Sequence, residues 1–200
     1  MSALPHQERS APDRPATDLR WLDPAAPPYA GVSELVMEMA RIQAAVGWLS
    51  VPPRTEVDAW LDGVLTSGGR MVSAVDPQGR LVGLGYWARQ EAAVLNHSAE
   101  LRKVMVHPAA QGAGVGRAVV AALVADAVLA GVELLLLDVR GNNHSALRLY
   151  ASLGFVVSGR RPDLIAVGAE RFDQVLMHRE LQRPADLLRH GGRREGPGHT

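Results

Sequence analysis

The stretch Glu100-Leu-Arg-Lys-Val-Met-Val-His-Pro-Ala-Ala-Gln-Gly-Ala-Gly-Val-Gly-Arg117 decides how the rest of the chain must fold. It predicts a short apolar strand that ends at Val106, a turn at His107-Pro108 and a glycine-rich loop from Gln111 to Gly116. A helix rich in Ala, Val and Leu is expected to follow directly, from Arg117 to Leu129. The first N–H groups of a helix have no partners inside it and lie at its positive end, where they bind anions. The segment is therefore predicted to hold a phosphate or pyrophosphate group.

Two common phosphate-binding patterns do not fit this loop. The dinucleotide fingerprint Gly-x-Gly-x-x-Gly needs a third glycine where Arg117 stands after Gly112 and Gly114. A P-loop ends in Gly-Lys-Ser/Thr, which the segment lacks. The pattern that fits is Gln-x-x-Gly-x-Gly, formed by Gln111, Gly114 and Gly116. On these residues alone, a tight connection between a strand and a helix remains the alternative.

A second motif lies downstream, at Asn143-His-Ser-Ala-Leu-Arg-Leu-Tyr150-Ala-Ser-Leu-Gly-Phe155. It resembles the signature Asn-x-x-Ala-x-x-Leu-Tyr-x-x-x-Gly-Phe of the Gcn5-related N-acetyltransferases (the GNAT superfamily), and the glycine-rich loop resembles the acetyl-CoA loop of the same family. The two motifs stand in the family's order, with one helix and one strand expected between them. The resemblance covers roughly residues 18–182. It implies an α/β (α+β) GNAT fold, a mixed and strongly twisted central sheet flanked by helices.

Composition sets the outer limits. With 200 residues, the chain is expected to form one domain over 18–182, between a disordered segment 1–17 and a flexible tail 183–200. Its formal net charge of zero gives no sign of a nucleic-acid or membrane partner. The absence of Cys excludes disulfides and thiolate catalysis. Without an apolar run that would make a signal peptide or a membrane span, a cytoplasmic location is expected.

Hydrophobic periodicity and turn residues predict the remaining elements. The expected strands are 18–23, 71–75, 80–89, 132–139, 155–160 and 172–181, and the expected helices are 33–46, 57–65 and 144–153. Asp76-Pro-Gln-Gly79 is a good turn for a hairpin between the second and third of these strands. The run Val132–Val139 contains four consecutive leucines and is predicted to be a strand buried on both faces. Residues 161–171 are expected to form a long loop.

The resemblance implies a site for acetyl-CoA on two segments. The backbone of Val104, Met105 and Val106 would pair with the pantetheine arm, because in this family that strand splays away from its neighbour. One of these amides would also polarise the thioester carbonyl. The pyrophosphate would be cradled by the N–H groups of the loop: Gln111, Gly112, Ala113, Gly114, Val115, Gly116 and Arg117. Asn143 would either bond the pantetheine or cap the helix that follows it.

Three side chains are the candidates for the chemistry. Tyr150 occupies the position of the family's tyrosine that faces the CoA sulfur, and a phenol with a pKa of ~10 can donate a proton to a thiolate; the alternative is a Tyr packed on the sheet. Glu100 stands where the histone-acetylating members carry a catalytic glutamate, so it is a candidate base or amine anchor, or else a solvated strand end. Asp138 closes a buried strand at the end where α/β sheets present groups to ligands. Its alternative role is a hydrogen bond to the Asn142-Asn143 turn.

Other polar and aromatic residues have lesser expected roles. His97, in a turn near Glu100, is a second candidate base. Two histidines are expected at the surface: His107 and His144. Three tryptophans are expected in the core: Trp48, Trp60 and Trp87. Trp48 is also expected at the edge of the acceptor pocket. The spacing of His and acidic residues forms no recognisable metal site, so no metal is expected.

Finer features narrow the expected function. Val46-Gly47-Trp48, the segment from Asn96 to Val106 and the strand that ends at Asp138 look like the tabtoxin-resistance acetyltransferases, in which an acid on each of two strands assists. This implies acetyl transfer from acetyl-CoA to the primary amine of a small molecule, of the kind that inactivates an antibiotic or toxin, by a monomer or homodimer. The alternatives are acetylation of a protein or peptide amine, and a non-catalytic module that binds acyl-CoA.

Overall fold

The computed structural model describes residues 17–25, 30–42, 48 and 50–181. The helices are α1 Ala30–Arg41, α2 Arg54–Thr66, α3 Val115–Leu129 and α4 His144–Ser152, with two 3₁₀ turns, η1 Ala93–Leu95 and η2 Pro108–Ala110. The strands are β1 Asp18–Trp21, β2 Arg70–Val75, β3 Leu81–Arg89, β4 Ser98–Val106, β5 Leu134–Arg140, β6 Val156–Val167 and β7 Glu170–Glu180. Residues 1–16 and 182–200, for which disorder and a flexible tail were predicted, lie outside the described residues.

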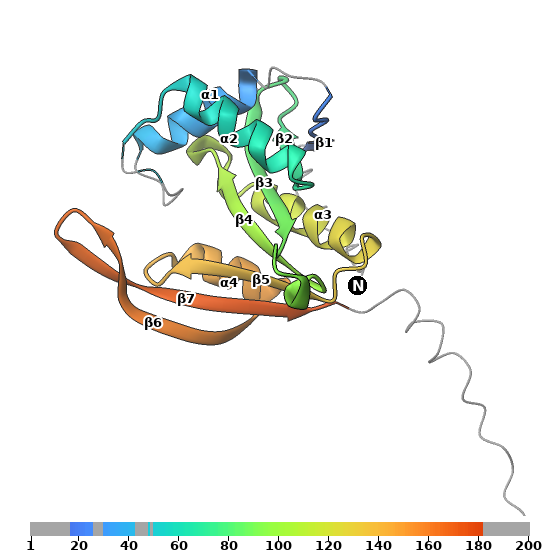
Figure 1. Cartoon of the computed structure of the whole chain (residues 1–200). Helices are drawn as coiled ribbons and strands as arrows, with labels where there is room; N and C mark the ends of the chain where they lie inside the picture. The colour runs from blue at the N-terminus through green and yellow to red at the C-terminus, as the bar shows by residue number, and fades with distance from the viewer. Residues whose placement is uncertain (1–16, 26–29, 43–47, 49, 182–200) are drawn as a thin grey trace, which may run out of the picture.

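The strands form one mixed sheet in the order β1-β2-β3-β4-β5-β7-β6. The β4–β5 pair is parallel and every other pair is antiparallel. Figure 1 shows the strong twist between the half that contains β2 to β4 and the half that contains β5, β7 and β6. The predicted α/β architecture is therefore confirmed, and so is the β2–β3 hairpin around the Asp76–Gly79 turn.

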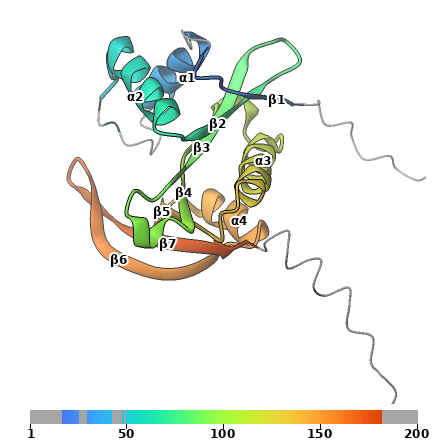
Figure 2. The ribbon, with the colours of Figure 1, turned by 45° about the vertical axis from the view of Figure 1, so that its right-hand side comes forward.

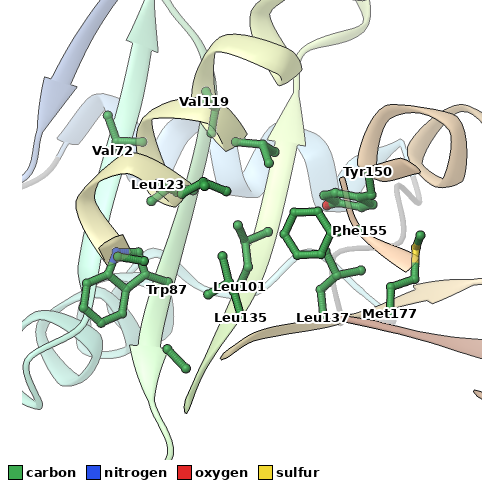
Figure 3. Close-up of a cluster of buried hydrophobic side chains, with 14 of the residues drawn as sticks. Val72, Trp87, Leu101, Val119, Leu123, Leu135, Leu137, Tyr150, Phe155 and Met177 are labelled. Atoms are coloured by element: carbon green, nitrogen blue, oxygen red, sulfur yellow. The ribbon is translucent and has the colours of Figure 1, made fainter. Parts of the chain in front are cut away.

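Helices cover both faces of the sheet. On one face, α1 and α2 pack over β2 to β4 through the buried residues Val32, Leu35, Val36, Met39, Ala40, Val57, Leu61, Leu65, Met71, Leu84, Tyr86 and Met105. On the opposite face, α3 and α4 close a larger core, part of which Figure 3 shows: Val72, Trp87, Leu101, Val119, Leu123, Leu135, Leu137, Tyr150, Phe155 and Met177. Burying one such large apolar side chain stabilises the fold by about 1.5–3 kcal/mol.

Asp126 fixes α3 to the strands beneath it. Its carboxylate accepts a hydrogen bond of 3.0 Å from the indole Nε1 of Trp87. It also accepts two from the Arg70 guanidinium, of 3.1 and 2.8 Å. Because Trp87 is on β3 and Arg70 is on β2, these bonds hold one end of the helix over two strands at once. The prediction that Trp87 is a core residue is confirmed.

The prediction of a long loop over residues 161–171 is wrong. These residues belong to a continuous β6–β7 hairpin whose strands meet between Val167 and Glu170. Figures 1 and 2 show this hairpin curving beyond the rest of the sheet, with its tip on the side that carries α1 and α2. Pro162 and Asp163 are unfavourable inside a paired strand, but the edge strand accommodates both at an irregularity between Arg161 and Ile165.

Several other predicted bounds differ from the structure by a few residues, and two of them concern the first helix and the helix after the loop. The first helix was expected to continue to Val46, but α1 ends at Arg41 and the side chain of Ile42 is half exposed. Val46 itself lies outside the described residues. The helix after the glycine-rich loop begins at Val115 rather than at Arg117, so the end of the loop is already helical.

Candidate active site

The site is organised around the place where β4 and β5 separate. The two strands pair only at Ser98 with Leu134, Ala99 with Leu135 and Glu100 with Leu136. Beyond Glu100, β4 continues to Val106 and stays paired with β3 on its other side. The backbone of β4 from Leu101 onward therefore has no ladder to β5, which leaves a free strand edge inside the sheet. The predicted residues Val104, Met105 and Val106 belong to this unpaired part of β4.

The glycine-rich loop places the start of α3 at the far end of the opened strand. Gly114 is the residue before the helix and has a φ of 89°, a left-handed conformation that favours glycine. Gly116 allows the helix to come close to its neighbours, because a Cβ there would lie 3.3 Å from methyl groups of Leu149 and Val106. The first helical hydrogen bond runs from the Ala118 N–H to the Gly114 carbonyl at 3.0 Å. The N–H groups before it therefore lie at the positive end of α3 without a helical acceptor.

The other residues predicted to bind the cosubstrate have local partners. The N–H groups of Gln111 and Ala113 donate to carbonyls within the preceding turns, at 3.2 and 3.4 Å, so they are partly satisfied. The Arg117 guanidinium donates to the Ser152 hydroxyl of α4 at 3.0 Å. The Asn143 side chain accepts from the Ala146 N–H at 3.2 Å, which makes it the cap of α4. Of its two predicted roles, the structure shows the cap.

Gly114→Asp is expected to weaken acetyl-CoA binding at least tenfold, about 1.4 kcal/mol. Aspartate tolerates the left-handed conformation, but its charge would lie where a phosphate is expected to bind. Gly114→Asn is the matched control, because asparagine has the same shape without the charge. Calorimetric titration of both folded variants with acetyl-CoA measures the difference. Equal affinities of the Asp and Asn variants would show that the start of α3 does not bind a phosphate.

Tyr150 is held by α4 under the opened part of the sheet. Its side chain is 7% exposed, and its ring packs edge-on against Phe155 with 5.7 Å between the ring centroids. Figure 3 shows the two rings together above Leu137 and Met177. Burial raises the pKa of the Tyr150 phenol well above its ordinary value, and the negative charge of Asp138 raises it further. Both effects keep the hydroxyl protonated, as a proton donor requires.

Glu100 and Asp138 lie on the same face of the sheet. Glu100 is paired with Leu136 of β5, and side chains alternate along a strand, so Asp138 points to the same side as Leu136 and Glu100. This is the face that carries α1 and α2. The Glu100 carboxylate forms an ion pair with Arg102 and is 3.5 Å from the side-chain amide of Gln90. If both carboxylates act on one substrate amine, they must lie on the same face of the sheet, and the register of β4 and β5 places them so.

A bulge in β4 adds two cations that the sequence analysis did not single out. Lys103 has a φ of 51°, unusual for a residue other than glycine, at the irregularity where β4 passes Gly85 of β3. Strict alternation would send Arg102 and Lys103 to opposite faces. Instead Arg102 contacts Glu100, while the Lys103 ammonium lies 4.1 Å from the centre of the Trp48 ring. The sequence signal was a pair of adjacent cations in the middle of the strand.

Three aromatic rings line the same face beside these cations. Trp48 packs edge-on against Trp60 at 5.4 Å, and Trp60 packs against Tyr86 at 5.8 Å. The Trp48 indole N–H donates to Glu56 at 3.1 Å. Trp60 and Tyr86 belong to the core under α1 and α2. The expectation that Trp48 borders an acceptor pocket stays a prediction.

The histidines differ in their surroundings. His107 is half-buried rather than a surface group: its Nδ1 accepts from the Ala109 N–H at 3.2 Å, and its Nε2 is 3.1 Å from Glu38. His97 and His144 are exposed. His107 also lines a cavity of about 510 Å³ between the β2–β3 turn, η2 and α1. Neither Tyr150 nor the two carboxylates line that cavity, whereas Ala113 and Val115 of the predicted pyrophosphate loop do.

The class of protein follows from a comparison of the sequence with known families. The profile of the acetyltransferase (GNAT) family matches residues 33–155, which include the opened strand β4, the glycine-rich loop and the Asn143–Phe155 segment. The chain belongs to this family, a family of N-acetyltransferases.

Parts of the chain are similar to individual members of the family. The chain is 32% identical over 82 residues to the L-methionine sulfoximine/L-methionine sulfone acetyltransferase of Salmonella typhimurium, a match that covers 41% of this chain and about half (48%) of that protein. It is 29% identical over 126 residues to the L-amino acid N-acyltransferase MnaT of Escherichia coli, covering 62% of this chain and 71% of MnaT. A phosphinothricin acetyltransferase from Sinorhizobium meliloti, solved in complex with acetyl-CoA, superimposes with a TM-score of 0.73 at 21% identity, over 84% of this chain and 91% of that one. The last likeness shows the fold alone.

Two features are absent from the part of the chain that the structure describes. No helix among them has the length and apolarity needed to cross a bilayer. In the same part of the chain, no group of three or more His, Asp or Glu side chains is arranged to hold a metal ion.

Proposed function

We propose that this protein transfers an acetyl group from acetyl-CoA to the primary amine of a small, amino-acid-like molecule. The observation that carries the proposal is the short β4–β5 ladder, which opens beside Glu100 and leads along a free strand edge to the start of α3. The named relatives that act on methionine derivatives and L-amino acids support the class of acceptor. An acceptor that is an antibiotic or toxin remains part of the proposal.

The residues along the opened strand fit acetyl-CoA from end to end. The N–H groups at the start of α3 would bind the pyrophosphate, and the unpaired backbone of Val104 to Val106 would pair with the pantetheine amides. Acetyl-CoA supplies the acetyl group as a thioester. A β4 amide near the point of separation would hold the thioester oxygen where negative charge develops during the reaction.

Two side chains would move the protons. A carboxylate on the acceptor side takes a proton from the substrate ammonium, and the neutral amine nitrogen forms its bond to the carbonyl carbon. As the carbon–sulfur bond breaks, Tyr150 donates its phenolic proton to the departing thiolate. Water or the carboxylic acid formed in the first step then returns a proton to Tyr150. Protons balance, because the nitrogen loses one proton before it attacks and a second as the amide forms. One of these two replaces the proton that Tyr150 gave to the sulfur, and the other is released to water.

Asp138 is the better placed of the two carboxylates to act as the base. Glu100 is already held in an ion pair by Arg102. In the described part of the chain, Asp138 makes no ion pair, and its side chain is exposed at the opened strands. We therefore assign proton removal to Asp138 and the anchoring of the ammonium to Glu100. Each carboxylate still favours a positive charge between them.

A turnover screen tests the proposed function. The protein with acetyl-CoA is offered L-amino acids, L-methionine sulfoximine, L-methionine sulfone and phosphinothricin, alongside short peptides with a free N-terminus and peptides with a free lysine amine. Release of the CoA thiol and the mass of the product are measured. Preferred turnover of the small acceptors supports the proposal. Preferred turnover of peptides would favour a protein acetyltransferase, and binding of acetyl-CoA without turnover of any amine would favour a non-catalytic module.

A further inference from the structure

The bulge in β4 brings two adjacent cations to the acceptor side of the opened strands. Arg102 lies beside Glu100, and Lys103 lies over Trp48. A positive φ at Lys103 is a strained conformation for a residue with a long side chain, and such strain gathers at functional sites. The bulge thus has a consequence that regular pairing would not have: both positive charges share one face with Glu100.

The Arg102 guanidinium has more N–H donors than its ion pair with Glu100 uses. A guanidinium carries five N–H donors. The hydrogen bond to Glu100 raises the pKa of Arg102, and a contact with the Tyr86 hydroxyl acts in the same direction, so the group stays charged at any working pH. Its side chain is 49% exposed, which leaves part of the guanidinium open on this face. It can therefore bind an anion and keep its ion pair with Glu100.

The Lys103 side chain is more buried than that of Arg102. Burial lowers the pKa of its ammonium, and the neighbouring Arg102 lowers it further. Both effects oppose the positive charge, and an anion placed next to the two cations would offset them. The Trp48 ring below the ammonium is attractive for the same charge and limits where Lys103 can point.

The charges along this face match a zwitterion. An α-amino acid carries its ammonium and carboxylate on one carbon, so the protein must present opposite charges side by side. Glu100 on β4 and Asp138 on β5 supply the negative side, and Arg102 and Lys103, on β4 with Glu100, supply the positive side. Another acidic residue on this side, Glu56, accepts a hydrogen bond from the Trp48 indole.

We propose that Arg102 and Lys103 form a subsite for the α-carboxylate of the acceptor and so select amino acids over simple amines. This inference rests on the proposed function and deepens it. Trp48 and Trp60 would then border the space for the rest of the acceptor, where a thioether or another apolar group packs against aromatic rings.

A rival cation exists on the same face. Arg140 is two residues beyond Asp138 on β5, so it points to the same side. Its guanidinium lies 4.9 Å from the centre of the Phe172 ring, and its buried Nε has no hydrogen-bond partner among the described residues. Arg102 and Lys103 are favoured because both follow Glu100 closely in β4, next to the point where β4 and β5 separate. The test includes Arg140 for this reason.

The decisive probe is a pair of product analogues that differ in one charge. N-acetyl-L-methionine carries a carboxylate, and N-acetyl-L-methioninamide carries a neutral group of the same shape. Calorimetry in saturating CoA measures the affinity of each for the wild-type protein, and steady-state kinetics compare L-methionine sulfone with its amide as acceptors. The variants are Arg102→Gln, Lys103→Met, the double variant and Arg140→Gln, with Arg160→Gln on exposed β6 as the matched control.

The wild-type protein is expected to bind the acid at least about tenfold more tightly than the amide. Each single change should reduce this ratio, and the double variant should bring it to within about threefold of unity. Lys103→Arg should keep the preference that Lys103→Met loses, which separates loss of charge from loss of folding. Arg160→Gln should keep the wild-type ratio.

Four results would overturn the inference: equal affinity of the wild-type protein for acid and amide, binding of neither compound, a preference that survives in the double variant, and a preference that only Arg140→Gln removes. The proposed function is tested separately. If the acid is preferred in binding while no amino acid is acetylated, the carboxylate subsite stands and the proposed function falls. If amino acids and their amides are acetylated equally well, the function stands and the subsite falls.

Discussion

Tyr150→Phe is expected to lower kcat about 10²-fold, because phenylalanine keeps the ring and removes the only proton that the residue can give. The ring of Tyr150 packs against Phe155 in a tightly closed core, so the substitution preserves volume and the edge-on contact. Affinity for acetyl-CoA should therefore stay close to that of the wild type. Steady-state kinetics at saturating acetyl-CoA, with a separate titration of acetyl-CoA, measure the two quantities.

The pH profile gives an independent check of Tyr150. Burial and the charge of Asp138 raise the pKa of the phenol, so it stays protonated as the pH rises through its ordinary value of ~10. The wild-type enzyme should therefore show no alkaline loss of kcat that arises from Tyr150 below about pH 10. An alkaline limb that disappears in Tyr150→Phe would contradict this placement. Unchanged kcat in the variant would mean that water protonates the thiolate and that Tyr150 only packs.

Changing Glu100 and Asp138 together should have the largest effect, a loss of about 10³-fold in kcat/KM for the amine. Their shared face would place both near the substrate ammonium in the proposed complex, so one carboxylate is expected to serve in part when the other is removed. Asp138→Asn should lower kcat more, because the proton goes to Asp138 in the proposed mechanism. Glu100→Gln should raise KM more, because it releases Arg102 and removes the anchor for the ammonium.

Double-mutant kinetics decide the point. Each single variant should lose less kcat/KM than the double variant loses in total. The reason is that the two carboxylates act on one ammonium, so one can partly replace the other. The acidic limb of the rate profile, which reports protonation of a carboxylate, should be lost in the double variant. Glu170→Gln, at the exposed tip of the β6–β7 hairpin, is the control for loss of a negative charge. If both single variants keep the kcat/KM of the wild type, neither carboxylate binds or deprotonates the amine, and His97 or a chain of waters would have to be tested next.

Much of the fold was predictable because its decisive segments are local. The Gln111–Gly116 loop and the helix after it could be predicted from the spacing of the glycines and from the change of the apolar pattern where the helix begins. The four leucines from Leu134 to Leu137 correctly predicted a strand. The expectation that it is buried on both faces is wrong, because only one face of β5 is fully buried and Asp138 on the other face is exposed. The prediction for residues 161–171 failed because Pro162 and Asp163 favour a turn in isolation. Pairing with β7, which lies next in the chain, overrides this local preference.

The candidate site was predictable only in part, because some of it depends on register. Motif spacing identified Tyr150 and Glu100, and Asp138 drew notice as a charge at the end of an apolar strand. That Glu100 and Asp138 share a face follows from the pairing of Glu100 with Leu136, which no local pattern contains. The positions of Arg102 and Lys103 depend on a bulge opposite β3, and a one-residue insertion in a ladder reverses the expected faces of everything that follows.

The place of β7 has a consequence for how the protein is made. It is the final strand of the described chain, yet it lies between β5 and β6 rather than at an edge. While the ribosome is still adding residues before Glu170, β6 has no neighbour to bond and β5 exposes one side of its apolar ladder. The meander of β1 to β4 needs only strands already synthesised. The nascent chain is therefore half-assembled until its last strand emerges, and a premature stop before β7 would release a protein with two unsatisfied strand edges for chaperones and proteases to recognise.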